Sequence, residues 1–152
     1  MNFAGIHDLR LSRRVLFAGI GIAGLVVALP TDATDNDRVL IDSIIASKQD
    51  LVGTYTATAL AIPSSATKLR AIASHHARHI TSLDAIAGIT ETPSPSATAS
   101  AVTTLAALSK IEMTNAALRR TQVQSAANPE LIRVLALIGA SEAVHGTQLA
   151  TA

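Results

Sequence analysis

Apolar residues recur at intervals of three and four along most of this chain. The segments with this spacing run from about Asp37 to Ala61, from about Ala66 to Ala87, from about Ala97 to about Ala126, and from Pro129 to about Leu149. Such spacing places apolar side chains on one face of an α-helix. No segment after residue 33 alternates in the way typical of a β-strand. The pattern therefore predicts an all-α protein with four amphipathic helices.

Residues that favour helix ends bound these segments. Asp35 or Asn36 is expected to cap the first helix, and Gly88 is suited to end the second. Asn128 followed by Pro129 predicts the start of the fourth helix. The Pro-rich link 89–96 is long for a simple turn, so it favours a crossover connection between the second and third helices. An up-down-up-down bundle is the alternative topology.

Each predicted helix carries polar residues near the middle of its apolar face. If the helices pack side by side, these residues share one depth in the bundle, where each polar group needs a hydrogen-bond partner or a metal. Tyr55 is expected to reach this layer with its hydroxyl. Arg119 is expected to extend out of the bundle and His75 to be solvated. The remaining polar residues of the layer are Lys48, His76, His79, Glu112, Glu142 and His145.

Composition and charge exclude several classes of function. The chain is 49% hydrophobic and 15% charged, and it has no cysteine, which excludes disulfides and thiolate chemistry. The segment after residue 33 is neutral, with nine basic and nine acidic residues, and Tyr55 is its only aromatic residue. A nucleic-acid partner is therefore not expected. Nothing in the sequence predicts a catalytic residue, a particular ligand or a particular protein partner, and a homodimer is left open.

The first 33 residues have the features of an export signal. Arg10, Arg13 and Arg14 precede an uncharged apolar run from Val15 to Leu29, which is shorter than the ~20 residues that a spanning helix needs. The stretch Ser12-Arg13-Arg14-Val15-Leu16-Phe17 resembles the twin-arginine export motif, with the general secretory route as the alternative. An exported protein of the cell envelope or extracellular space is expected. If the segment stays uncleaved, a membrane-tethered helical adaptor is expected instead.

The spacing Glu142-Ala143-Val144-His145 puts a carboxylate and an imidazole on one helix face. With the four-helix pattern and the Pro-rich link, it makes residues 34–152 resemble the ferritin-like four-helix bundles. The most similar of these are the small secreted actinobacterial domains of unassigned function. This resemblance implies one glutamate on each of two helices and a Glu-x-x-His on each of the other two, which together bind two iron or manganese ions.

The match to that pattern is partial. Glu142 and His145 fit the last Glu-x-x-His, Glu112 fits the single glutamate of the third helix, and His79 fits the other histidine. His76 stands at one expected glutamate position and Lys48 at the other. Because two metal ions need carboxylates to balance their charge, this departure argues against di-iron oxidase or iron-storage activity.

Two hypotheses follow for the layer. In the first, the core is metal-free and the protein is non-catalytic, with a degenerate metal site in which Lys48 pairs with Glu112 or Glu142. In the second, the core binds one transition metal ion, such as zinc or iron. The candidate ligands of that ion are His76, His79, Glu112, Glu142 and His145. The position of the Lys48 ammonium, inside the cluster or in solvent, separates the two hypotheses.

Overall fold

The computed structural model describes residues 34–88, 100–102 and 104–152, and all the regular secondary structure in these residues is helical. All four predicted helices are present, and no strand occurs in these residues. The predicted export segment, Met1–Ala33, lies outside them. The helices are α1 (Asp35–Ala61), α2 (Ala66–Ala87), α3 (Leu105–Ser125) and α4 (Pro129–Ala150), with a short 3₁₀ helix η1 (Pro63–Ser65) between the first two.

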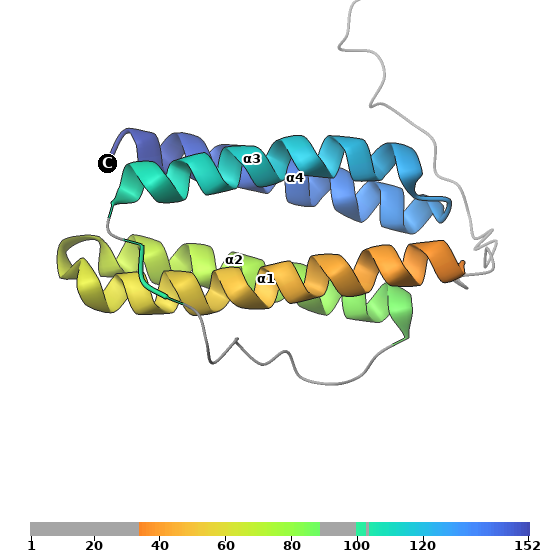
Figure 1. The fold of residues 1–152 in the computed structure, drawn as a ribbon, viewed down its shortest axis with the longest axis horizontal. Coiled ribbons are helices and arrows are strands. Elements are labelled where there is room, and N and C mark those ends of the chain that lie inside the picture. The colour runs from red at the N-terminus through yellow and green to blue at the C-terminus, as the bar shows by residue number, and fades with distance from the viewer. Residues whose placement is uncertain (1–33, 89–99, 103) are drawn as a thin grey trace, which may run out of the picture.

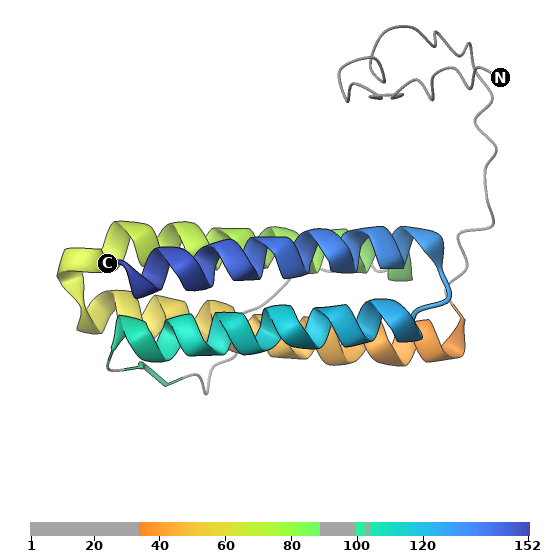
Figure 2. The ribbon, with the colours of Figure 1, turned by 90° about the horizontal axis from the view of Figure 1, so that it is seen from above.

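The four helices pack as two antiparallel hairpins. Helices α1 and α2 form one layer, and α3 and α4 form the other (Figure 1). Viewed from above, α4 lies over α2 and α3 lies over α1 (Figure 2). Helix α2 ends at one end of the bundle and α3 begins at the opposite end, so the two run in the same direction. The bundle therefore has the crossover arrangement that the long Pro-rich link favours.

The beginning of α1 differs from the prediction. The Thr34 hydroxyl, and not Asp35 or Asn36, caps the helix by accepting a hydrogen bond from the Asp37 backbone N–H at 3.2 Å. Asp35 and Asn36 therefore lie inside the first turn. Threonine is a suitable cap, although a weaker one than aspartate or asparagine, since its oxygen reaches the free N–H groups of the first turn.

The start of α4 follows the prediction and is fixed to α1. The Asn128 side chain accepts hydrogen bonds from the backbone N–H groups of Glu130 at 2.9 Å and Leu131 at 3.1 Å. The buried Asp37 carboxylate in turn accepts one from the Asn128 N–H at 3.0 Å. Burial alone would raise the pKa of Asp37, but its hydrogen bonds outweigh burial and lower it. This contact sets the α3/α4 turn against the first turn of α1.

Helix α3 begins later than the predicted start near Ala97. Residues 97–99 lie outside the described part, but residues 100–102 and 104 are not helical and α3 begins at Leu105. Thr104 caps the helix, and the Val102 N–H donates to the Thr58 hydroxyl of α1 at 2.9 Å. This bond to α1 competes with helix formation for the Val102 N–H, which explains the late start.

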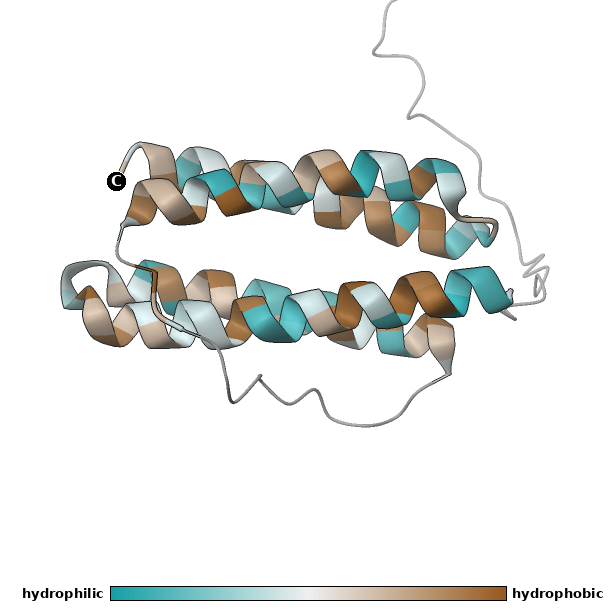
Figure 3. Cartoon of the chain, in the orientation of Figure 1, coloured by the Kyte–Doolittle hydropathy of each residue, from teal (hydrophilic) through white to brown (hydrophobic). Residues whose placement is uncertain are grey.

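Two apolar clusters fill the two halves of the bundle and leave the polar layer between them. All four helices mix hydrophobic and hydrophilic residues along their length (Figure 3). The cluster near the start of α1 consists of Ile41, Ile44, Leu83, Ala87, Leu131, Val134, Leu135 and Ile138. The cluster near its end consists of Leu51, Tyr55, Ala59, Leu69, Ile72, Ala73, Leu108 and Leu149.

Candidate functional site

A layer of buried charged and polar side chains crosses the middle of the bundle. Every helix contributes to it, and none of its members is more than 2% exposed. Ionisable groups at this depth are rare unless they are paired, so the layer is the candidate functional site. We define the polar layer as Lys48, His76, Glu112, Arg119, Glu142 and His145.

Two contacts join the diagonally opposed helices of the bundle. The Lys48 ammonium of α1 pairs with Oε1 of Glu142 on α4. Nε2 of His76 on α2 lies 2.8 Å from Oε1 of Glu112 on α3. The Lys48 ammonium also lies 3.1 Å from His76 Nδ1, so the two diagonals are connected. Residues from all four helices thus form one network that fixes their relative register.

The protonation state of His76 follows from its neighbours. A charged Lys48 has no lone pair, so His76 Nδ1 must accept the hydrogen bond between them and His76 Nε2 must carry the proton. That N–H then donates to Glu112 Oε1. Burial lowers the pKa of His76 from 6.5 to about 4, although its bond to Glu112 opposes the change. At neutral pH, His76 is therefore uncharged, with both of its nitrogens engaged.

Glu112 is the anion at the centre of the layer. Besides its bond to His76, it accepts a hydrogen bond from the Tyr55 hydroxyl at 2.6 Å, as predicted for that tyrosine. Burial alone would raise the pKa of Glu112, but His145, His76 and Tyr55 together hold it well below its usual range. Burial and the nearby Glu112 charge raise the pKa of Tyr55. Glu112 is therefore ionised at neutral pH, and Tyr55 keeps its proton.

Arg119 belongs to the polar layer, and the prediction that it extends into solvent is wrong. Its side chain is buried, with Nε 3.5 Å from Glu142 Oε1 and Nη1 bonded to the Gln122 side chain. The backbone explains the inward position, since a Cβ on Gly139 of α4 would lie only 3.0 Å from the Arg119 Cβ. Glycine thus lets α4 approach α3 closely over the arginine stem.

The ionised groups of the layer balance one another. Lys48 and Arg119 carry two positive charges, while Glu112 and Glu142 carry two negative charges. Burial lowers the pKa of Lys48, but the contact with Glu142 opposes this effect. A buried charge is tolerated when it is paired and hydrogen-bonded. These four charges therefore cancel one another without any added ion.

Two histidines lie differently from their predicted positions. His75, expected in solvent, is half-buried, and its Nδ1 lies 2.8 Å from His145 Nε2 across the α2–α4 interface. His79, expected in the buried seam, is also only half-buried, and its ring packs edge-on against His76. A small rotation of α2 about its axis accounts for the difference between the predicted and the observed burial of these two histidines. The spacing of apolar residues does not determine the helix rotation to so small an angle.

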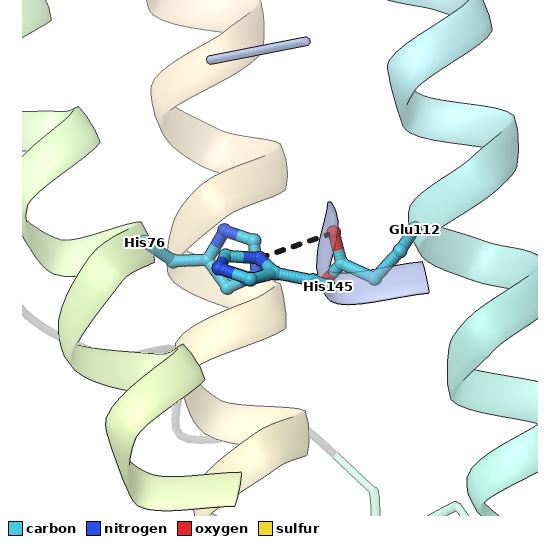
Figure 4. A group of neighbouring side chains, drawn as sticks. All are labelled: His76, Glu112 and His145. Atoms are coloured by element: carbon cyan, nitrogen blue, oxygen red, sulfur yellow. Dashed lines mark hydrogen bonds and ion pairs between the residues drawn. The ribbon is translucent and has the colours of Figure 1, made fainter. Parts of the chain in front are cut away.

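Three of the five predicted metal ligands come together. Donor atoms of His76, Glu112 and His145 all lie within 4.8 Å of one another (Figure 4). Glu142 is not in this group because it faces Lys48 and Arg119, and His79 is not in it either. His145 Nδ1 lies 3.8 Å from Glu112 Oε2, and neither atom has a hydrogen-bond partner among the described residues. The residue types fit one metal ion, but the Lys48 charge is beside them.

Comparison with known proteins identifies no relative of this chain. No protein-family model, no curated protein and no solved structure matches the chain. Among the described helices, none combines the length and apolar character required to cross a membrane. The site must therefore be interpreted from its own chemistry.

Proposed function

We propose that this protein is an exported, non-catalytic, ferritin-like helical-bundle protein of the cell envelope, with a metal-free core built on a degenerate metal site. The observation that carries the proposal is the position of the Lys48 ammonium. It lies inside the polar layer, in contact with Glu142 Oε1 and His76 Nδ1, and its positive charge is beside the donor groups of His76, Glu112 and His145 that a metal would need.

The chemistry of His76 supports a metal-free core. Metal binding at His76 Nε2 would require that nitrogen to lose its proton while Nδ1 still accepts from the charged Lys48. An imidazole in that state is an anion, which is a high-energy form near neutral pH. Binding would therefore require Lys48 to lose its proton or to move. A divalent ion would also add two positive charges to a layer whose two positive and two negative charges already cancel.

The ferritin-like part of the proposal is supported by the arrangement of the helices. Parallel α2 and α3 and the Glu-x-x-His on α4 agree with the pattern of that superfamily. Lys48 and His76 stand where the pattern has glutamates, which removes the carboxylates that two metal ions need. The role we assign to the layer is to fix helix register, a use known for buried polar residues.

The exported location is supported by the sequence of residues 1–33. A basic start and a moderate apolar run are typical of a cleaved signal. Mass spectrometry of the protein from its native host tests this part of the proposal. A mature chain that lacks the apolar run from Val15 to Leu29 would support export with cleavage of the signal. A chain that retains this run would support the membrane-tethered alternative.

Metal analysis tests the metal-free core. The mature protein is purified from its native host without chelator or affinity histidines, beside a His76→Gln variant. His76→Gln removes a core donor but leaves the half-exposed His75 in place. We expect the same metal content in both proteins. About one equivalent of a transition metal that disappears in His76→Gln would contradict the proposal.

A second candidate function is binding of a single transition metal ion in the core. It is favoured by the 3.8 Å approach of Glu112 Oε2 and His145 Nδ1, which have no other hydrogen-bond partner in the described part of the chain. His76 Nε2 would complete a three-donor site of the kind that holds zinc or iron(II). The same metal analysis decides between the two candidates.

A further inference from the structure

Beside the polar layer, two further imidazoles of α2 lie close to one of the layer's own histidines, His145 of α4. His75 and His79 are four residues apart on α2, so they lie one turn apart on the same side of the helix. His145 of α4 faces them, with its ring stacked on that of His75 at a centroid distance of 5.1 Å. Both α2 histidines are half-buried, whereas His145 itself is only 2% exposed.

The two ends of the His145 ring face different surroundings. Nδ1 points inward toward the Glu112 carboxylate, 3.8 Å away, whereas Nε2 points outward to His75 Nδ1 at 2.8 Å and to the Ser141 hydroxyl at 3.4 Å. A carboxylate behind one nitrogen favours the proton there and leaves the lone pair on the other nitrogen. Metal-binding histidines commonly donate their other N–H to a carboxylate, and a shortening of this 3.8 Å separation to hydrogen-bond distance would give His145 that arrangement.

We propose that His75 and His145 bind a divalent zinc-like ion at the α2–α4 interface, with His79 as third ligand, on the outer side of the polar layer. Nδ1 of His75 and Nε2 of His145 are 2.8 Å apart, and a separation of about 3.4 Å suits two nitrogens on a tetrahedral zinc ion. A small movement apart of two half-buried rings therefore accommodates the metal.

His79 supplies the third imidazole by a change of rotamer. Its Nδ1 has no hydrogen-bond partner among the described residues, so no existing bond holds the ring in place. Three neutral imidazoles and a water are ligands that suit zinc.

This site shares only His145 with the polar layer, and it does not require the metal-free core that we propose as part of the function to bind an ion. Its ligands lie outside the Lys48–Glu142 pair, and no ligand except His145 touches the core anion. Metal at the outer site neither requires Lys48 to move nor adds charge between Lys48 and Arg119. The two proposals therefore fail under different results.

Zinc titration of the metal-free full-length protein tests the outer site, by calorimetry and by cobalt(II) absorption, whose intensity reports tetrahedral geometry. We expect one equivalent of zinc to bind, and at least tenfold weaker binding in His75→Ala and in His79→Ala. The comparison variant for the core is His76→Gln, which removes an inward-facing imidazole whose ring contacts those of His79 and His145. It is expected to keep one equivalent of zinc bound and to lose less affinity than His75→Ala or His79→Ala. Circular dichroism confirms that each variant is folded.

Two results would overturn the outer site. Absence of zinc binding to the folded protein would mean that the His75–His145 contact is only a hydrogen bond between imidazoles. Binding that survives His75→Ala but is lost in His76→Gln would place the ion in the core, which would also contradict the proposed function. Weaker binding in both His75→Ala and His79→Ala, with zinc still bound by His76→Gln, supports the outer site and leaves the core metal-free.

Discussion

Replacement of Glu142 by glutamine tests how much the bundle depends on charge pairing in its core. Glutamine keeps the size of the side chain and one carbonyl oxygen that accepts from Lys48, but it removes the negative charge. Lys48 and Arg119 would then face Glu112 alone, and the layer would carry a net positive charge. Because Lys48 and Glu142 are both 0% exposed, solvent cannot compensate for the loss.

The expected cost is large relative to the stability of a small domain. Removal of one partner of a buried ion pair typically costs about 3–5 kcal/mol. The retained hydrogen bond and the contact of Lys48 with His76 place this variant near the lower figure. For a domain of roughly 120 residues, a loss of about 3 kcal/mol lowers the melting temperature by about 12 °C. Total stabilities are typically only about 5–15 kcal/mol.

Thermal and urea unfolding of the mature domain, followed by circular dichroism, measure this effect. The matched control is Glu130→Gln, which makes the same change in an exposed pair with Arg133 and is expected to leave the melting temperature unchanged. Burial lowers the pKa of Lys48, and loss of Glu142 lowers it further. Between this lowered folded-state pKa and 10.5, the unfolded chain binds more protons than the folded variant, so the difference in stability from the unchanged protein should narrow as pH rises through that range.

The double variant Lys48→Met/Glu142→Gln provides the decisive comparison. It removes one charge of each sign and leaves Arg119 with Glu112, so it is expected to be more stable than Glu142→Gln alone. The reasoning would be refuted if Glu142→Gln matched the unchanged protein in stability, or if the double variant were less stable than the single one.

Three further predictions concern the same bundle. Burial lowers the pKa of His76 from 6.5 to about 4, which corresponds to about 3 kcal/mol of stability. This contribution is complete above pH 6.5 and is lost as pH falls toward 4, because the unfolded chain takes up a proton that folded His76 does not. The urea midpoint of His76→Gln should therefore depend less on pH over this range than that of the unchanged protein. Tyr55→Phe removes a hydrogen bond to an ionised carboxylate and should cost about 1.5–3 kcal/mol in urea unfolding, a result that an unchanged midpoint would contradict. Asn128→Ala removes the cap of α4 and should cost about 1 kcal/mol, while Asn128→Ser should restore most of it; equal stability of the two variants would exclude the cap as the cause.

The helices were predictable because their apolar spacing is regular and their end signals are local. Asn128 and Gly88 act as predicted, since a cap and a left-handed helix end need only neighbouring residues. The start of α3 was not predictable because a bond between Val102 and Thr58, 44 residues away in the chain, decides where the helix can begin. Local preference gives no information about such a contact.

The polar layer was predictable in part for the same reason. Lys48, Glu112 and Glu142 interrupt apolar stripes, so their burial follows from helix periodicity once the helices pack together. Arg119 was assigned to solvent because arginine stems usually extend outward, although its place on the stripe and the glycine at position 139 are signals of burial. His75 was missed because the facing residue, His145, belongs to a helix whose position only the tertiary structure gives.

The most direct test of a metal-free core is a crystal structure of the mature protein grown with zinc, with anomalous differences recorded at the zinc edge. Our account predicts no anomalous peak between His76 and Glu112, with the Lys48 ammonium in contact with Glu142. A peak in the core bonded to His76 and Glu112, with Lys48 turned toward solvent, would contradict it.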